Sequence, residues 1–164
     1  MDFIKYYFLE EYLFKEVRNN FQKRGYLTPK EFFCIVIWKS NRAKTAIKKK
    51  LSGMGKLDKV IRELTHDIYN NKDKSKLSIL KNKWRFNLPM ATAILTVLYP
   101  KKFTIKDIRV LNQLKIKDFS GLKKYFDEFL PKVKKASAQK SLRDKDRELW
   151  GKSFYEDLEK FLKN

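Results

Sequence analysis

Residues 85–110 read RFNLPMATAILTVLYPKKFTIKDIRV, and this stretch decides the fold. Pro89–Tyr99 is strongly apolar, and Pro100 closes it, which predicts a buried helix with proline in its first turn. After a short basic loop, Thr104 is placed to cap a second helix over 105–114. Two helices joined by a short loop therefore form the predicted centre of the protein.

The flanking sequence has the periodicity of helices throughout. Thr28, Pro29 and Glu31 form a capping box with proline at the first helical position, and the run Phe32–Trp38 that follows is apolar all round. It predicts a central buried helix, with a buried strand as the alternative. Apolar spacing predicts further helices over 3–23 (ending at Gly25), 42–51, 57–68, 77–84, 119–133 (broken late by Pro131) and 141–162. We expect one compact all-α domain over 1–164, with a possible linker at 137–140.

Composition excludes several classes of protein. The 164 residues are 43% hydrophobic, enough for a core, so global disorder is excluded. The longest apolar run, Phe32–Trp38, is too short to span a membrane, and the acidic, aromatic N-terminus is no signal peptide, so an intracellular, cytoplasmic protein is expected. One cysteine and one histidine exclude a disulfide framework and a multi-histidine metal centre. No metal, cofactor or membrane partner is expected.

The charge is segregated along the chain. With 39 Lys+Arg against 19 Asp+Glu, the formal net charge is +20. Three stretches contain Lys and Arg but no Asp or Glu: 32–57, 74–106 and 129–143. This pattern favours a polyanionic partner, DNA more than RNA, and predicts that the three basic blocks converge on one face. A solvated lysine-rich surface and an anionic membrane surface are the alternatives.

The segment 85–110 resembles the core of the helix-hairpin-helix DNA glycosylase superfamily. Residues 91–95 (ATAIL) are similar to the start of its hairpin-following helix, and residues 105–110 (IKDIRV) are similar to its catalytic-Asp segment, with Asp107 at the Asp position. Together with residues 38–42 (WKSNR) and 143–150 (RDKDRELW), the block 91–110 also resembles a set of small uncharacterised proteins that share this fold. The resemblance implies a compact helical glycosylase fold that binds DNA.

The chain departs from the family at two positions. Pro89 stands where the lysine of the bifunctional members would be, so an enzyme of this kind would be an N-glycosylase without lyase activity. Arg85-Phe86-Asn87 stands where the family has Gly-x-Gly, so the phosphate-binding hairpin is degraded, although Arg85 can supply a side-chain contact. The chain does contain a Gly-x-Gly elsewhere, within 51–57 and next to Lys56, which is either a separate phosphate-binding hairpin or a helix C-cap.

Asp107 is the candidate catalytic residue. A carboxylate can stabilise the oxocarbenium-like sugar that forms as a base departs, and it can orient water. It can equally be a first-turn acid held by the helix dipole, or an ion-pair partner of Arg109, Arg143 or Arg147. Arg143, Asp144, Asp146 and Arg147 are predicted to form an ion-pair network. The candidate nucleic-acid-binding residues are Lys39, Arg42, Lys44, Lys81, Lys83, Trp84 (a base-stacking candidate), Arg85, Lys106 and Arg109.

Three functions are consistent with these observations. The first is a DNA-binding protein of glycosylase-like fold, with base excision through Asp107. The second is a DNA- or RNA-binding module that kept the fold without the chemistry. The third is a protein-interaction factor whose charge is incidental. The degraded hairpin argues against the first, and the acid-free blocks argue against the third.

Overall fold

The computed structural model describes residues 3–163, and within them every regular element is a helix. The α-helices are α1 (Ile4–Tyr7), α2 (Leu9–Tyr12), α3 (Arg18–Arg24), α4 (Pro29–Ser40), α5 (Lys44–Ser52), α6 (Leu57–Asn70), α7 (Asp73–Ser78), α8 (Leu88–Leu98), α9 (Ile108–Gln113), α10 (Leu122–Lys124), α11 (Leu130–Lys135) and α12 (Leu142–Lys163). The all-α prediction is confirmed. No helix within residues 3–163 combines the length and the apolar character that a membrane crossing requires.

The predicted first helix is interrupted. The backbone leaves the helical region at Phe8 (ψ 52°), which separates α1 from α2, and a π-helical turn (Leu13–Val17) joins α2 to α3. α3 ends where expected, at Gly25, whose φ of 77° is the left-handed conformation that glycine adopts without steric cost. The N-terminal segment is therefore two helices with a kink and a bulge, because the apolar spacing over 3–23 does not follow a single uniform helix.

Thr28 starts α4 as a complete capping box. Its side chain accepts from the Glu31 N–H, and the Glu31 carboxylate accepts from the Thr28 N–H at 2.9 Å. The helix over Phe32–Trp38 is confirmed, and the strand alternative is wrong. One face of α4 is buried through Phe32, Ile35 and Val36, whereas Ile37 is exposed, so the helix is not buried all round.

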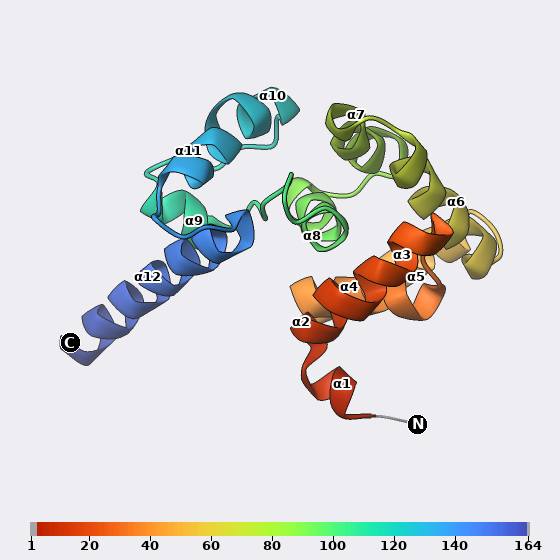
Figure 1. Ribbon diagram of the computed structural model, residues 1–164, viewed down its shortest axis with the longest axis horizontal. Coiled ribbons are helices and arrows are strands. Elements are labelled where there is room, and N and C mark those ends of the chain that lie inside the picture. The colour runs from red at the N-terminus through yellow and green to blue at the C-terminus, as the bar shows by residue number, and fades with distance from the viewer. Residues whose placement is uncertain (1–2, 164) are drawn as a thin grey trace.

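The most buried helix is α8, which lies between α1–α7 and α9–α12 (Figure 1). All but one of its residues are buried, as the apolar sequence predicts. Pro89 occupies the first turn of α8, as predicted. The helix is also capped by the Asn87 side chain, which accepts from the Met90 N–H at 2.9 Å.

Two predictions in the C-terminal half are wrong. Thr104 does not cap a helix: residues 103–107 run without helical structure, the Thr104 N–H donates to the Tyr125 hydroxyl, and Asp107 caps α9 instead. Pro131 does not break its helix, because a π-helical turn (Tyr125–Phe129) directly precedes it and α11 continues to Lys135.

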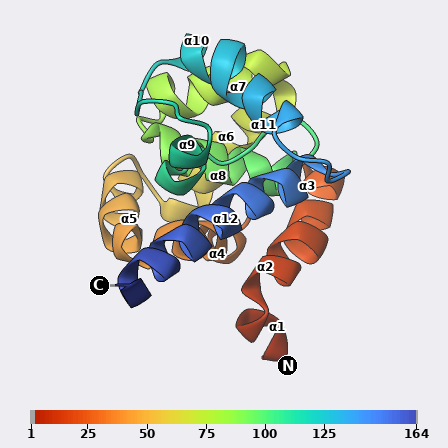
Figure 2. The ribbon, with the colours of Figure 1, turned by 90° about the vertical axis from the view of Figure 1, so that its left-hand side faces the viewer.

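The last helix, α12, packs along α9, and its C-terminal half extends beyond the rest of the molecule (Figure 1). Residues 136–141, which include the possible linker 137–140, connect α11 to α12 without helical structure. Figure 2 shows α12 crossing in front of α4, with α9 beside it and the N-terminal helices next to its beginning. This crossing places the first turns of α12 next to the ends of α2 and α4.

Candidate functional site

A cleft of about 500 Å³ lies where α12 crosses the ends of α2 and α4. Its walls come from α2 and from three segments that are distant in the sequence: 38–42, 91–110 and 143–150. Its lining residues are Glu10, Trp38, Lys39, Ile105, Asp107, Arg143, Asp146, Arg147 and Trp150. Segments that are far apart in the sequence therefore meet around Asp107.

Asp107 holds two partners in this cleft. As the N-cap of α9, it accepts from the Arg109 N–H at 3.0 Å through Oδ1, and Oδ2 accepts from the Lys39 ammonium at 2.9 Å. Burial would raise the pKa of Asp107, but the hydrogen bond and charge of Lys39, with the Arg109 N–H and charge, lower it overall. Asp107 is therefore an anion at neutral pH, and its ion-pair partner is Lys39, a residue of α4.

A second carboxylate, Asp146, lies in the same cleft with the opposite shift. Its side chain is 3% exposed and accepts from the Arg143 guanidinium at 2.7 Å. Burial raises the pKa of Asp146, Arg143 and the Ile105 N–H oppose that effect, and the negative charge of Asp107 adds to it; the net direction is upward. The cleft thus combines one stabilised anion with one carboxyl that is disfavoured as an anion.

The expected network at the start of α12 is confirmed. Arg143 binds Glu10 of α2 as well as Asp146, and Arg147 binds Glu10 at 3.0 Å and Asp144 at 3.0 Å. Glu10, which the sequence did not single out, is the residue that ties α12 to α2. Its signal was only an acid next to the aromatic residues of the first helix.

Two tryptophans line the cleft from different helices. Trp38 comes from α4, and the Arg143 guanidinium lies 5.3 Å from its ring. Trp150 comes from α12, is 42% exposed, and stacks on Phe154 with the ring planes 7° apart. The Arg109 guanidinium lies 5.2 Å from the Trp150 ring. Neither tryptophan was among the candidate contact residues, and their signals were their places in the segments 38–42 and 143–150.

The candidate binding residues divide between the cleft and its surroundings. Lys39 lines the cleft, whereas Arg109 follows Asp107 and pairs with Asp157 at 2.6 Å. Arg42 is exposed between α4 and α5, and Lys44, exposed at the start of α5, donates to the Asn41 side chain at 2.6 Å. These residues extend the charged surface from Lys39 toward α5.

Lys81, Arg85 and Lys106 line a second hollow of about 780 Å³ between the hairpin and Phe119. Arg85 is exposed, and Lys81 is half-buried. Lys106 is buried and bound to Asp118, so a phosphate would have to displace that carboxylate. Lys106 is thus a poor candidate for nucleic-acid contact.

The prediction of Trp84 as a stacking platform is wrong. Its side chain is 4% exposed, and its indole N–H donates to Asp67 at 3.1 Å. Lys83, next to it, binds the same carboxylate at 2.5 Å and lies 5.2 Å from the Trp84 ring. The basic residues beside Trp84 therefore flank a buried tryptophan, whose indole N–H is held by Asp67, the ion-pair partner of Lys83.

The turn at Arg85 has a glycine-like backbone. Arg85 has φ 54°, in the left-handed region that favours glycine. Lys50 of α5 donates to the Trp84 and Arg85 carbonyl oxygens at 2.9 and 3.2 Å, and its ammonium lies 3.8 Å from the Phe86 ring. The turn is thus held from α5 by a lysine.

The Gly-x-Gly formed by Gly53, Met54 and Gly55 lies in the turn after α5. The Gly53 N–H donates to the Lys49 carbonyl, and the Gly55 N–H donates to the Ser52 carbonyl. Both amides close this turn, so neither is available for a phosphate in this conformation. The helix C-cap interpretation accounts for these glycines.

Residues of the three basic blocks meet in pairs. Lys50 of the first block holds the Arg85 turn of the second, and Lys39 of the first block shares the cleft with Arg143 of the third. Lys101 of the second block shares a separate groove with Lys134 of the third. Among residues 3–163, no three His, Cys, Asp or Glu side chains are grouped in a way that could hold a metal ion.

Comparison with known proteins gives no match: no protein-family model, no curated protein and no solved structure is similar to this chain.

Proposed function

We propose that this protein binds DNA and is a monofunctional DNA N-glycosylase that uses Asp107. The observation that carries the proposal is the position of this carboxylate: it is an anion inside a cleft that also holds Lys39 and Arg143 and is lined by two tryptophans. The cleft volume of about 500 Å³ lies within the range of small-ligand sites. A nucleoside extruded from DNA needs such a pocket, with aromatic groups that stack on the base.

The reaction needs one stabilised anion next to the sugar. When the N-glycosidic bond breaks, the base leaves with the bonding electron pair, and the sugar carbon becomes cationic. The Asp107 carboxylate stabilises this cation electrostatically and orients a water molecule, whose oxygen bonds to the carbon. One proton of that water is released, and the departing base takes up a proton. Each Asp107 oxygen has one hydrogen bond within the protein, so each keeps a lone pair for these roles.

Asp146 supports the same assignment. Two carboxyl groups whose environments shift their pKa values in opposite directions are typical of sites that separate an anionic role from a proton-donating role. Asp107 has the lowered pKa and Asp146 the raised one, and both line the cleft. In this proposal Asp107 faces the sugar cation, and solvent water supplies the proton that the departing base takes up.

The alternative function is a DNA- or RNA-binding module without chemistry. It is favoured by the two structural roles that Asp107 already has, as the cap of α9 and as the partner of Lys39. A carboxylate whose charge is balanced by an ammonium stabilises another cation less strongly. The lost glycines of the hairpin favour the same alternative.

The experiment compares the wild type with Asp107→Asn on duplexes that contain uracil, alkylated purines, oxoguanine or mismatches. Asparagine keeps the shape and removes the charge, so the rate of base release should fall by about 10²–10³-fold, as for the loss of one preorganised electrostatic group. DNA affinity should not weaken, since the variant carries one negative charge less. Asp73→Asn, which removes an exposed, Lys102-paired carboxylate, is the matched control and should keep full activity.

Melting curves of the same proteins separate the two functions. Asparagine can still cap α9, so Asp107→Asn should lose only the Lys39 ion pair, which should cost about 0.5–1 kcal/mol. Because the folded-state pKa is lowered, this contribution is present above the unfolded-state pKa and is lost as the pH falls through the folded-state value. A wild type that releases no base from any duplex, with a destabilised Asp107→Asn, would leave the binding module as the function.

A further inference from the structure

Another concave surface lies beside the cleft, between α3 and the start of α12, and we call it the α3–α12 groove. Its volume is about 700 Å³. It is lined by six cations that come from α3, the loop after α8, α11, the connection 136–141 and α12: Arg18, Lys101, Lys134, Lys140, Arg143 and Lys145. No carboxylate is among the described residues that line it.

Most of these cations have no counter-charge in the protein. Within residues 3–163, only Arg143 of the six lies within ion-pair distance of a carboxylate. Lys145 donates to the Lys134 carbonyl at 2.5 Å, which holds its ammonium near α11. In the cleft, by contrast, all three cations are paired: Lys39, Arg143 and Arg147. Five unpaired like charges around one hollow repel each other, and a bound polyanion would relieve that repulsion.

The groove adjoins the cleft, because Arg143 lines both. An extended chain that passes this guanidinium can therefore contact both hollows. Phe14 adds apolar surface among the cations, which suits the sugars of a nucleic-acid strand. A concave surface fits a strand better than it fits a flat anionic surface.

We propose that the α3–α12 groove binds the phosphodiester backbone of the DNA whose nucleoside enters the cleft. This inference rests on the proposed function and extends it. None of the five unpaired cations is among the candidate contact residues named from the sequence, although Lys101, Lys134 and Lys140 lie in its acid-free basic blocks. Each phosphate neutralised by a lysine or arginine releases counterions, so the groove contributes to affinity in a salt-dependent way.

The test uses the double variant Lys101→Ala/Lys140→Ala and a matched control, Lys59→Ala/Lys72→Ala. All four lysines are exposed, and the control pair lies in α6 and just before α7, outside both hollows. Both variants carry the same net charge. Binding of a fluorescent DNA duplex is titrated over a range of salt concentrations. The slope of log K against log salt should become less negative by about 1.8 in the groove variant, which is about 0.9 for each lost contact, and should not change in the control.

The outcomes distinguish the two proposals. Equal slopes for both variants, with normal binding by the wild type, would overturn the groove alone and leave the Asp107→Asn experiment to decide the function. A wild type that does not bind DNA at low salt would overturn both. Vesicles that contain phosphatidylserine form the last arm: if the groove variant loses vesicle binding and keeps its DNA slope, the groove is a membrane surface and this inference is wrong.

Discussion

Glu31 and Asp107 are both carboxylates that cap a helix and bind a cation, yet they lie in different kinds of surroundings. Glu31 finds its partners close in sequence: Arg24, Thr28 and Asn20, all within 11 residues. Asp107 takes its cation from Lys39, 68 residues away. The side chain of Glu31 is 7% exposed, and that of Asp107 is 21% exposed.

The difference lies in what remains open around the charge. The corner between α3 and α4 is filled, with Glu31 accepting from three side chains and one backbone amide. The cleft keeps a hollow of about 500 Å³ beside Asp107, with paired cations and two tryptophans around it. The same ion-pair chemistry is therefore purely structural in the corner, whereas in the cleft it faces a space that a ligand can enter.

The largest effect on stability is expected in the corner. Glu31→Ala should lower the free energy of unfolding by about 2–4 kcal/mol, because it removes the capping box and leaves Arg24 without its partner. Chemical denaturation measures the loss, and Glu16→Ala, at an exposed pair with Lys5, should cost under about 0.5 kcal/mol. DNA affinity should not fall in either variant, and a Glu31→Ala protein that is as stable as Glu16→Ala would contradict this interpretation.

The pH profile sharpens that first comparison. Burial would raise the pKa of Glu31, but hydrogen bonds from Thr28 and Asn20 and the charge of Arg24 lower it overall. A carboxylate with a lowered folded-state pKa contributes stability that is lost as the pH falls through that pKa. The destabilisation caused by Glu31→Ala should therefore have its full size above about pH 5, where unfolded Glu is ionised, and should shrink at lower pH.

Arg143→Ala should have the next largest effect, about 2 kcal/mol, because it leaves Asp146 buried without its cation. The folded-state pKa of Asp146 is raised, so the protonated carboxyl tolerates the loss at low pH, and the destabilisation grows as the pH rises through that value. The pH dependence of this loss thus has the opposite origin to that of Glu31→Ala, because the pKa of Glu31 is lowered and that of Asp146 is raised. Adding Asp146→Asn should restore part of the stability, and a double-mutant cycle over pH 4–8 measures the coupling.

The last experiment should give no signal. Borohydride should trap no covalent complex with DNA that contains abasic or damaged sites. A Schiff base needs a free amine at the reacting carbon, and among the described residues Lys39 is the lysine that lines the cleft. Lys83 and Lys106 are bound to carboxylates outside the cleft, and Lys39 is bound to Asp107 within it. Trapping that disappears in Lys39→Ala would show lyase chemistry and make Lys39 the nucleophile.

Local sequence determined the elements whose signals are short-range. The capping box at Thr28, the glycine end at Gly25 and the proline-led α8 all follow from residues within one or two turns of each other, and the structure has each of them. The cap of α9 was misplaced at Thr104 because that residue is also a good cap. In the structure its backbone N–H and carbonyl are instead bonded to the Tyr125 hydroxyl, 21 residues later.

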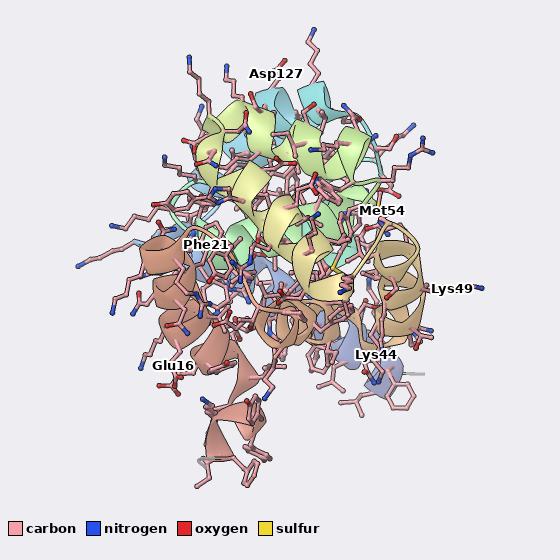
Figure 3. All side chains as sticks on the ribbon, turned by 90° about the vertical axis from the view of Figure 1, so that its right-hand side faces the viewer. Glu16, Phe21, Lys44, Lys49, Met54 and Asp127 are labelled. Carbon is pink, nitrogen blue, oxygen red and sulfur yellow. The ribbon has the colours of Figure 1, made fainter. Side chains whose placement is uncertain are left out.

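The sequence thus determined by itself that the chain is helical, strongly basic and organised around the segment 85–110. It also marked Asp107 as a residue to examine. Tertiary structure alone decided which charges face each other. Lys39 reaches Asp107 and Arg143 reaches Glu10. Trp150 lines the same hollow because α12 lies across α2 and α4. Many other side chains that end in nitrogen point outward, as Figure 3 shows. The physical reason is that helix caps and periodicity act over a few residues, whereas a cleft is made by packing elements that the chain places far apart.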